Sequence, residues 1–272
     1  MNLNGGLTSK RAVKSNTKKI KRILKNIDKH VDDENKLRPT TFIVGYGSII
    51  NTESRVSTGG KDIGNAIPVR ICKSAGLRRV WNFQKPDVAR LTALGLEMTR
   101  GSKLKNRKGK IVTKRSSSKD VFCQGKGSTI NGVLYPVYSN IRKFDEREEG
   151  YFRLRLRKNQ LEALSWQNLP SYDCKIYVYC IDKPQQKRRP TFDLPILQTY
   201  VDVCIKGCLE YGENFAREFI QTTGGWSKFW LNDRQIPRRP WLHEPMFKIV
   251  DQCLKRHCKK YGSILPEDYD EI

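Results

Sequence analysis

The sequence of 272 residues predicts an α+β fold, and two patterns along the chain carry this prediction. Short apolar runs rich in β-branched and aromatic residues recur between residues 41 and 181, separated by turn-forming residues, which indicates an antiparallel sheet or barrel. From residue 195 the apolar residues follow helical spacing instead. We therefore expect a basic N-terminal arm at 1–38, a β-rich domain at 39–182 and a helical C-terminal extension at 190–272.

The composition fits a globular protein with an extreme positive charge. Hydrophobic residues make up 38% of the chain, enough for a core, and 52 Lys and Arg stand against 28 Asp and Glu, a net charge of +24. Such a balance favours either a polyanionic partner, here weak contact with nucleic acid without sequence preference, or a surface that serves solubility. The sequence leaves both explanations open.

The eight cysteines and three histidines do not form a metal-binding pattern. No two cysteines have C-x-x-C spacing, and His257 beside Cys258 is the single close pairing of the two residue types. We therefore expect free thiols and no metal site. The sequence has no secretory h-region and no run of ~20 apolar residues, so we expect a cytoplasmic protein without a membrane span.

Residues 1–38 form the basic arm, and we expect residues 1–16 to be disordered. An amphipathic helix is predicted at 17–33, because five apolar residues recur at helical spacing: Ile20, Ile23, Leu24, Ile27 and Val31. The narrow apolar stripe favours packing on the domain over contact with an anionic surface.

The stretch from Thr41 to Ile50 predicts a buried strand that enters a tight turn. Gly45 and Gly47 allow unusual backbone angles and the close approach of a ligand. Successive amides in such a turn can bind an anion such as a carboxylate, although an ordinary β-turn is the simpler explanation of this stretch alone. A dinucleotide fingerprint and a nucleophile elbow are excluded, because both need glycine at position 50.

A short helix and three strands are predicted next. They are the helix at 51–58 and the strands at 66–72, 76–83 and 91–97. Residues 100–127 carry ten Lys and Arg against Asp120, and we interpret them as a basic insertion that forms a solvated loop. Phe122 is its single aromatic residue, so sequence-specific reading of nucleic acid is not expected.

A strand at 130–138 leads into a helix predicted from Ser139 to Gly150. Four carboxylates crowd the last part of this helix: Asp145, Glu146, Glu148 and Glu149. The helix dipole disfavours negative charge at this end. Such local conflicts are more common at functional sites, so these residues are candidates for chemistry.

The remaining elements complete the two regions. We expect strands at 152–157 and 174–181, a polar linker at 183–190, a helix at 195–223 divided at Gly212, and a last helix at 244–260. Strict alternation in the first of these strands gives it one basic face.

Two motifs in this order resemble the γ-glutamylcyclotransferase-like superfamily. Residues 46–48 (Tyr-Gly-Ser) are similar to its YGS substrate loop, and residues 145–151 are similar to its D-x-R-E-x-G-Y segment, which holds the catalytic glutamate. The runs at 75–83 and 92–96 are similar to its central strands. The resemblance covers residues 40–181 and implies a small mixed, mostly antiparallel β-barrel with flanking helices.

The resemblance places the general acid and base at Glu148, with Glu149 and Glu146 as alternatives. It also implies that the turn amides hold the glutamyl end of a substrate and that a tyrosine donates a hydrogen bond to it. The substrate-binding residues are then Tyr46, Gly47, Ser48, Ile49 and Tyr151. Neither a metal nor an organic cofactor is implied.

The reaction of this superfamily is intramolecular. The α-amine of a γ-glutamyl compound attacks its own γ-carbonyl, which closes the ring of 5-oxoproline and releases the γ-linked amine, and one carboxylate can move the proton. The substrate (glutathione, a γ-glutamyl amino acid or a γ-glutamylamine), the oligomeric state and the role of residues 190–272 stay open. The alternative is a non-catalytic binding or regulatory module of the same fold that contacts nucleic acid or another polyanion through its basic segments.

Overall fold

The computed structural model describes residues 38–87, 89–112, 121–138, 141–164, 167–181, 188–238 and 247–261. The chain divides into two units, Met1–Pro39 and Thr40–Ile272, and all the helices and strands described belong to the second. The helix predicted at 17–33 lies outside the described residues, as does most of the linker predicted at 183–190.

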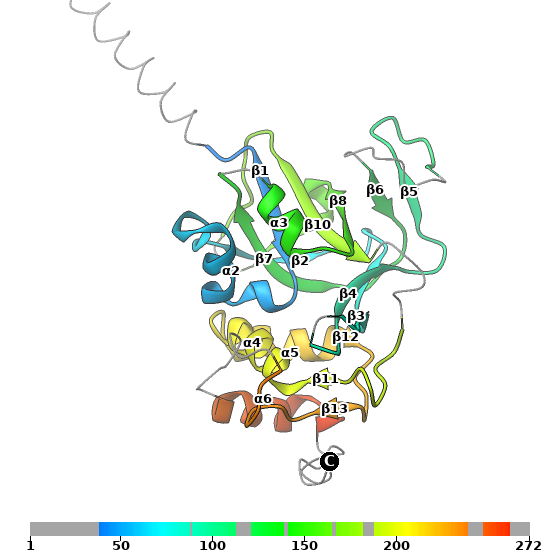
Figure 1. Ribbon diagram of the computed structural model, residues 1–272. Helices are drawn as coiled ribbons and strands as arrows, with labels where there is room; N and C mark the ends of the chain where they lie inside the picture. The colour runs from blue at the N-terminus through cyan, green and yellow to red at the C-terminus, as the bar shows by residue number, and fades with distance from the viewer. Residues whose placement is uncertain are drawn as a thin grey trace, which may run out of the picture. The chain divides into compact units, whose positions relative to one another are not determined.

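An eight-stranded sheet forms the main layer of this unit and curls into a half-barrel (Figure 1). In order of pairing, its strands are β5 (Lys103–Lys105), β6 (Phe122–Gln124), β8 (Tyr151–Leu156), β10 (Lys175–Ile181), β1 (Thr41–Gly45), β7 (Ile130–Pro136), β2 (Ile67–Ile71) and β9 (Leu161–Ala163). β1 runs parallel to β10 and antiparallel to β7, so the sheet is mixed. The predicted α+β class is therefore confirmed.

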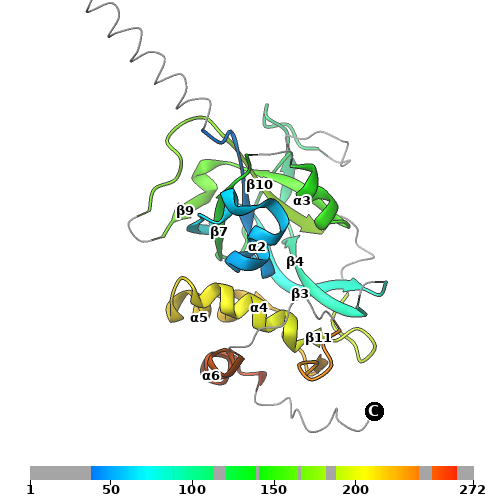
Figure 2. The same cartoon turned by 60° about the vertical axis from the view of Figure 1, so that its left-hand side comes forward.

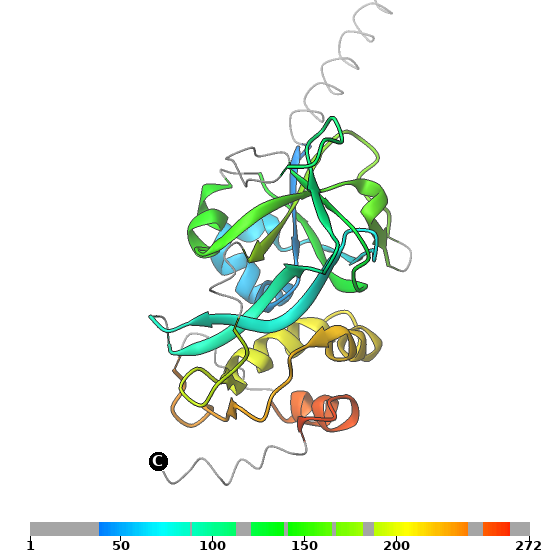
Figure 3. The same cartoon turned by 90° about the vertical axis from the view of Figure 1, so that its right-hand side faces the viewer.

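A long hairpin of β3 (Leu77–Lys85) and β4 (Leu91–Met98) forms a second sheet. β12 (Thr223–Gly224) joins it in parallel, with Thr223 opposite Arg79. Figure 3 shows the hairpin passing between the main sheet and the C-terminal helices. A strand from the predicted extension thus completes a sheet of the predicted β-rich domain.

Five α-helices occur among the described residues: α2 (Thr52–Gly59), α3 (Arg142–Arg147), α4 (Gln198–Leu209), α5 (Glu213–Thr222) and α6 (Phe247–His257). In Figure 2, α2 and α3 lie in front of the main sheet, and the last three helices group below it. Gly212, with a φ of +97°, separates α4 from α5 as predicted. None of the helices described is both long and apolar enough to cross a membrane.

The interpretation of residues 100–127 as a solvated loop is wrong at both ends. β5 and β6 pair with each other, and β6 adds to β8 in the main sheet. Leu104, Val121 and Cys123 are buried in the core there. The sequence did not reveal these strands because each has only three residues in a basic segment. Residues 113–120 lie outside the described part of the chain.

The C-terminal region begins as a strand and not as a helix. Ile196 and Leu197 form β11 (Ile196–Leu197), which pairs in parallel with β13 (Trp230–Leu231). α4 therefore starts at Gln198, and the predicted helix start at residue 195 is wrong.

One hydrophobic core joins the strands to the C-terminal helices, and none of the eight cysteines forms a disulfide. α4 comes very close to the segment after β1 at Gly207, where a methyl group would lie 2.3 Å from the backbone nitrogen of Asn51. Only glycine fits at such a separation. α4 therefore packs directly on the segment that follows β1.

Candidate active site

The predicted substrate turn follows β1 and runs into a 3₁₀ turn, η1 (Ser48–Ile50). A methyl group at Gly45 would lie 2.4 Å from Cγ2 of Ile49, and one at Gly47 would lie 3.3 Å from the hydroxyl of Tyr200. Neither glycine has a positive φ. Gly45 is therefore needed for space, and Gly47 packs tightly against Tyr200.

Arg55, a fully buried arginine on α2, bonds to the backbone of the turn. Its guanidinium donates hydrogen bonds to four carbonyl oxygens, those of Ile49 (3.1 Å), Ile50 (2.8 Å), Ile63 (2.9 Å) and Gly64 (2.6 Å). Because a buried cation needs such partners, these bonds fix the backbone of the turn. The sequence placed Arg55 on a helix but gave no sign of this role.

A second fully buried arginine, Arg79 of β3, ties the turn to the C-terminal helices. Its Nη1 donates to the carbonyl oxygens of Tyr46 at 3.2 Å and Asn131 at 2.8 Å. Its Nη2 donates to the carbonyl oxygen of Phe219 on α5 at 3.0 Å. Burial lowers the pKa of Arg79 to about 10, so it stays charged at neutral pH. The extension therefore helps to hold the predicted substrate turn.

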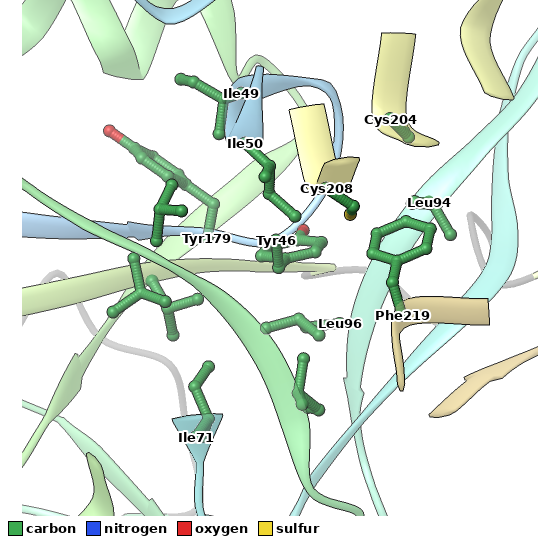
Figure 4. Packing of buried hydrophobic residues seen from close by; sticks show 14 of the residues in the cluster. Tyr46, Ile49, Ile50, Ile71, Leu94, Leu96, Tyr179, Cys204, Cys208 and Phe219 are labelled. Carbon is green, nitrogen blue, oxygen red and sulfur yellow. The ribbon is translucent and has the colours of Figure 1, made fainter. Parts of the chain in front are cut away.

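The side chain of Tyr46 belongs to the core. Figure 4 shows its ring among Ile50, Leu96, Cys208 and Phe219. Burial raises the pKa of Tyr46 well above its ordinary value, and the negative charge of Glu148 raises it further. The hydroxyl therefore stays protonated at neutral pH, and Tyr46 anchors the turn by packing.

Of the three candidate glutamates, Glu148 alone lines the pocket that also contains the turn. α3 has only six residues and ends at Arg147, so its last turn carries Asp145 and Glu146 as predicted, while Glu148 and Glu149 lie beyond the helix. Glu148 lies at the C-cap, and Gly150, with a φ of +88°, turns the chain into β8. Glu146 and Glu149 are exposed.

Arg147 connects the two predicted motifs. Its Nε lies 3.5 Å from Oε1 of Glu148, and its Nη2 donates to Oγ of Ser48 at 3.5 Å. Its Nη1 donates to the carbonyl oxygen of Ser54 on α2 at 2.9 Å. The sequence showed Arg147 among acidic residues, but not that it reaches the turn.

The neighbouring carboxylate, Asp145, has a structural role. The hydroxyl of Tyr179 donates to its Oδ1 at 2.9 Å, and Nε of Arg153 lies 3.0 Å from the same oxygen. Asp145 thus joins α3 to β10 and β8.

The pocket has a cavity volume of about 100 Å³. The structure brings all the predicted site residues to it, together with several that the sequence did not indicate. The lining includes the predicted Tyr46, Gly47, Ser48, Ile49, Glu148 and Tyr151, and the unpredicted Lys85, Tyr135, Arg147, Tyr179 and Tyr200. These last residues come from five separate elements; Arg147 belongs to the D-x-R-E-x-G-Y segment, and the other four lie outside both motifs.

Tyr151, another predicted substrate-binding residue, bonds within the protein. Its hydroxyl donates to the carbonyl oxygen of Leu94 at 2.7 Å, so its one proton is already used. A phenol oxygen can still accept a hydrogen bond. The predicted donation from Tyr151 to a substrate therefore stays a prediction, and it would require the bond to Leu94 to break. Among the residues that the structure describes, no group of three or more His, Cys, Asp or Glu could hold a metal ion.

No protein-family model and no curated protein matches this chain. Among solved structures, a γ-glutamyl cyclotransferase is similar over 64% of this chain and 85% of its own, with a TM-score of 0.38 and 13% identity. A γ-glutamyl cyclotransferase from yeast, described as specific to glutathione, is similar over 67% of this chain and 89% of its own, with a TM-score of 0.32 and 14% identity. The chain is thus only distantly similar to these proteins, and the likeness does not assign it an activity.

Proposed function

We propose that this chain cyclises a γ-glutamyl group to 5-oxoproline and releases the γ-linked amine, with Glu148 as general acid and base. One observation carries the proposal: the turn at Tyr46–Ile49 and Glu148 line a single pocket. The two segments are far apart in sequence, since Ser48 and Arg147, which contact each other, are separated by 99 positions. The reaction requires a substrate-binding turn and a carboxylate in the same pocket, and the two motifs supply these parts.

The chemistry needs one carboxylate and no protein nucleophile. The α-amine attacks the γ-carbonyl carbon, and the new carbon–nitrogen bond closes the five-membered ring. Glu148 accepts the proton that the amine loses and delivers it to the leaving nitrogen as the old carbon–nitrogen bond breaks. Because both reacting groups belong to one molecule, correct folding of the substrate supplies much of the rate, up to ~7–11 kcal/mol.

The pocket also suits the charge of a γ-glutamyl group, whose α-carboxylate is an anion. The backbone of Gly47–Ile49 lies at the start of η1, where no side chain caps the amides. Successive backbone amides of this kind bind anions. Arg147 and Lys85 add positive charge to the lining. Glu148, whose side chain is 22% exposed, can be reached by a ligand from the pocket.

The test is turnover of a panel of γ-glutamyl compounds, namely glutathione, a γ-glutamyl amino acid and a γ-glutamylamine, with detection of 5-oxoproline. Glu148→Gln is expected to lower kcat by about 10²–10⁴-fold, the usual cost of losing a general base, without changing the thermal midpoint. Glu149→Gln and Glu146→Gln are matched controls that should keep wild-type kcat, because both side chains are exposed.

Two results would contradict the proposal. Wild-type kcat in Glu148→Gln would remove Glu148 as the acid and base, and loss of activity in Glu149→Gln instead would move the role by one residue. If the wild type forms no 5-oxoproline from any compound, the binding-module alternative replaces the enzyme. The weak contact with nucleic acid, expected to fade steeply as salt rises, is a separate prediction.

A further inference from the structure

Tyr135 carries a buried hydroxyl group that has no hydrogen-bond partner among the described residues. Its side chain is fully buried at 0% exposure. A buried donor without a partner destabilises the folded protein, because water would have bonded to it in the unfolded chain. Such a group is therefore expected where a ligand supplies the missing partner.

The position of Tyr135 points to the pocket. It lies on β7 opposite Ile43 of β1, the strand that leads into the turn. Its Cε1, next to the hydroxyl-bearing carbon, lies 3.4 Å from where a methyl group at Gly45 would stand. Phe144 packs on the ring with a centroid separation of 5.6 Å. The ring is thus held in place, and Tyr135 lines the same pocket as Glu148.

Other polar groups behave differently. The hydroxyls of Tyr151 and Tyr179, which line the same pocket, donate to Leu94 and Asp145. The other buried side-chain atoms without partners among the described residues are Nε1 of Trp81, Oδ1 of Asn82 and Nε1 of Trp230. None of these three residues lines the pocket of Glu148. Tyr135 is therefore the unsatisfied donor that faces the candidate chemistry.

We propose that Tyr135 is a further catalytic residue, whose hydroxyl donates a hydrogen bond to the γ-carbonyl oxygen of the substrate. This inference rests on the proposed cyclisation. When the α-amine adds to the γ-carbon, the electron pair of the carbonyl bond moves to this oxygen, and it returns when the leaving amine departs. A donor aimed at the oxygen stabilises the charge that develops there.

Two features select this oxygen over the α-carboxylate. Glu148 must reach both nitrogens bonded to the γ-carbon, so a donor close to Glu148 also lies close to the γ-carbonyl. The α-carboxylate is already matched to the amides of the turn. Burial raises the pKa of Tyr135 well above its ordinary value, with a further contribution from the charge of Glu148, so the hydroxyl remains a donor throughout the neutral range.

The test is Tyr135→Phe, measured for kcat and KM on the best γ-glutamyl substrate and for thermal stability. We expect kcat to fall about 10²–10³-fold, as on loss of one oxyanion donor, while KM changes little. The thermal midpoint should stay the same or rise, because the variant loses only an unpaired hydroxyl. Tyr261→Phe is the matched control: its hydroxyl donates to Asp251 at 2.6 Å, so its loss should lower the midpoint and leave kcat unchanged.

The outcomes separate this inference from the function on which it rests. Wild-type turnover with normal kcat in Tyr135→Phe overturns the role of Tyr135 and leaves the proposed function intact. A higher KM at normal kcat also overturns it, because the hydroxyl then binds the ground state. A fall in the midpoint as large as that of Tyr261→Phe would mean a structural partner. No turnover by the wild type removes both the function and the inference.

Discussion

Buried polar groups have close hydrogen-bond partners between the C-terminal helices, whereas in the pocket one of them has none among the described residues. Between the helices, Arg234 donates two hydrogen bonds to Asp202 at 2.7 Å each, and two more to Asp251 at 2.7 and 3.1 Å. Gln198 and Tyr261 add bonds to the same carboxylates. In the pocket, by contrast, the hydroxyl of Tyr135 has no hydrogen-bond partner in the described part of the chain, and Glu148 lies a longer 3.5 Å from Arg147.

Under the proposed function, this contrast separates groups that serve the fold from groups that would meet a ligand. In the helical network one arginine pairs with two carboxylates, so the network holds elements together. In the pocket, Arg55 and Arg79 hold the backbone of the turn, and Arg147 joins the turn to Glu148. Stability and function thus draw on different polar groups, and substitutions in the two regions should have different signatures.

The largest effect on stability is expected from Arg234→Met. The change leaves Asp202, whose side chain is 1% exposed, without its cation. Breaking a buried pair from one side costs about 3–5 kcal/mol, which chemical denaturation can measure, while kcat of the folded fraction should be unchanged. Arg90→Met is the control, because its pair with Asp193 spans 3.9 Å at side-chain exposures of 67% and 75%. If both variants lost the same unfolding free energy, the helical network would contribute no more than an exposed ion pair.

An intermediate effect on both properties is expected from Gly45→Ala. The new methyl group would stand 2.4 Å from Cγ2 of Ile49, so the turn must move. We expect a loss of about 1–3 kcal/mol in unfolding free energy, as for overpacking, and a roughly 10²-fold lower kcat/KM, since a shift of ~1 Å can cost that much.

The matched control for the turn is Gly224→Ala on β12, where the nearest atoms lie 3.7 Å away, an ordinary contact. This variant should match the wild type in stability and turnover. Undiminished kcat/KM in Gly45→Ala, with stability lowered, would mean that the turn is only structural.

The smallest effect is expected from Glu213→Gln, at the exposed end of the helical region. The hydrogen bond from Arg256 lowers the pKa of Glu213, and one with His257 adds to this. A lowered folded-state pKa gives stability above the ordinary glutamate pKa of about 4.3, and this stability is lost as pH falls through the folded-state value.

The thermal midpoint of Glu213→Gln should therefore lie slightly below that of the wild type at about pH 7, and the difference should vanish at about pH 2. High salt should also reduce the difference, because the carboxylate is exposed and is screened. An equal difference at both pH values would be incompatible with this pairing.

Much of the fold could be predicted from local patterns. The apolar run before the turn gave β1, and Gly212 divided α4 from α5, because both signals lie in neighbouring residues. β5 and β6 were missed since strands of only three residues have no periodicity to detect. Their placement depends on pairing with β8, which is a long-range property.

The candidate site was predictable where a motif is contiguous and not elsewhere. The turn and Glu148 came from short segments, and the structure places them in one pocket. The residues that hold them, such as Arg55, Arg79 and Arg147, could not be identified, because their meaning lies in the carbonyl and hydroxyl groups that they reach. Nor did any pattern distinguish the unpaired Tyr135 from the satisfied Tyr151.

The position of Arg79 has a consequence for the order in which the protein is made. It bonds the carbonyl of Tyr46, yet its partner on α5, Phe219, is 140 positions later in the chain. At a synthesis rate of ~5–20 residues per second, this partner follows Arg79 by roughly 7–28 s. Until then the nascent chain must keep the guanidinium hydrated, so the turn can acquire its final support only after α5 has been synthesised.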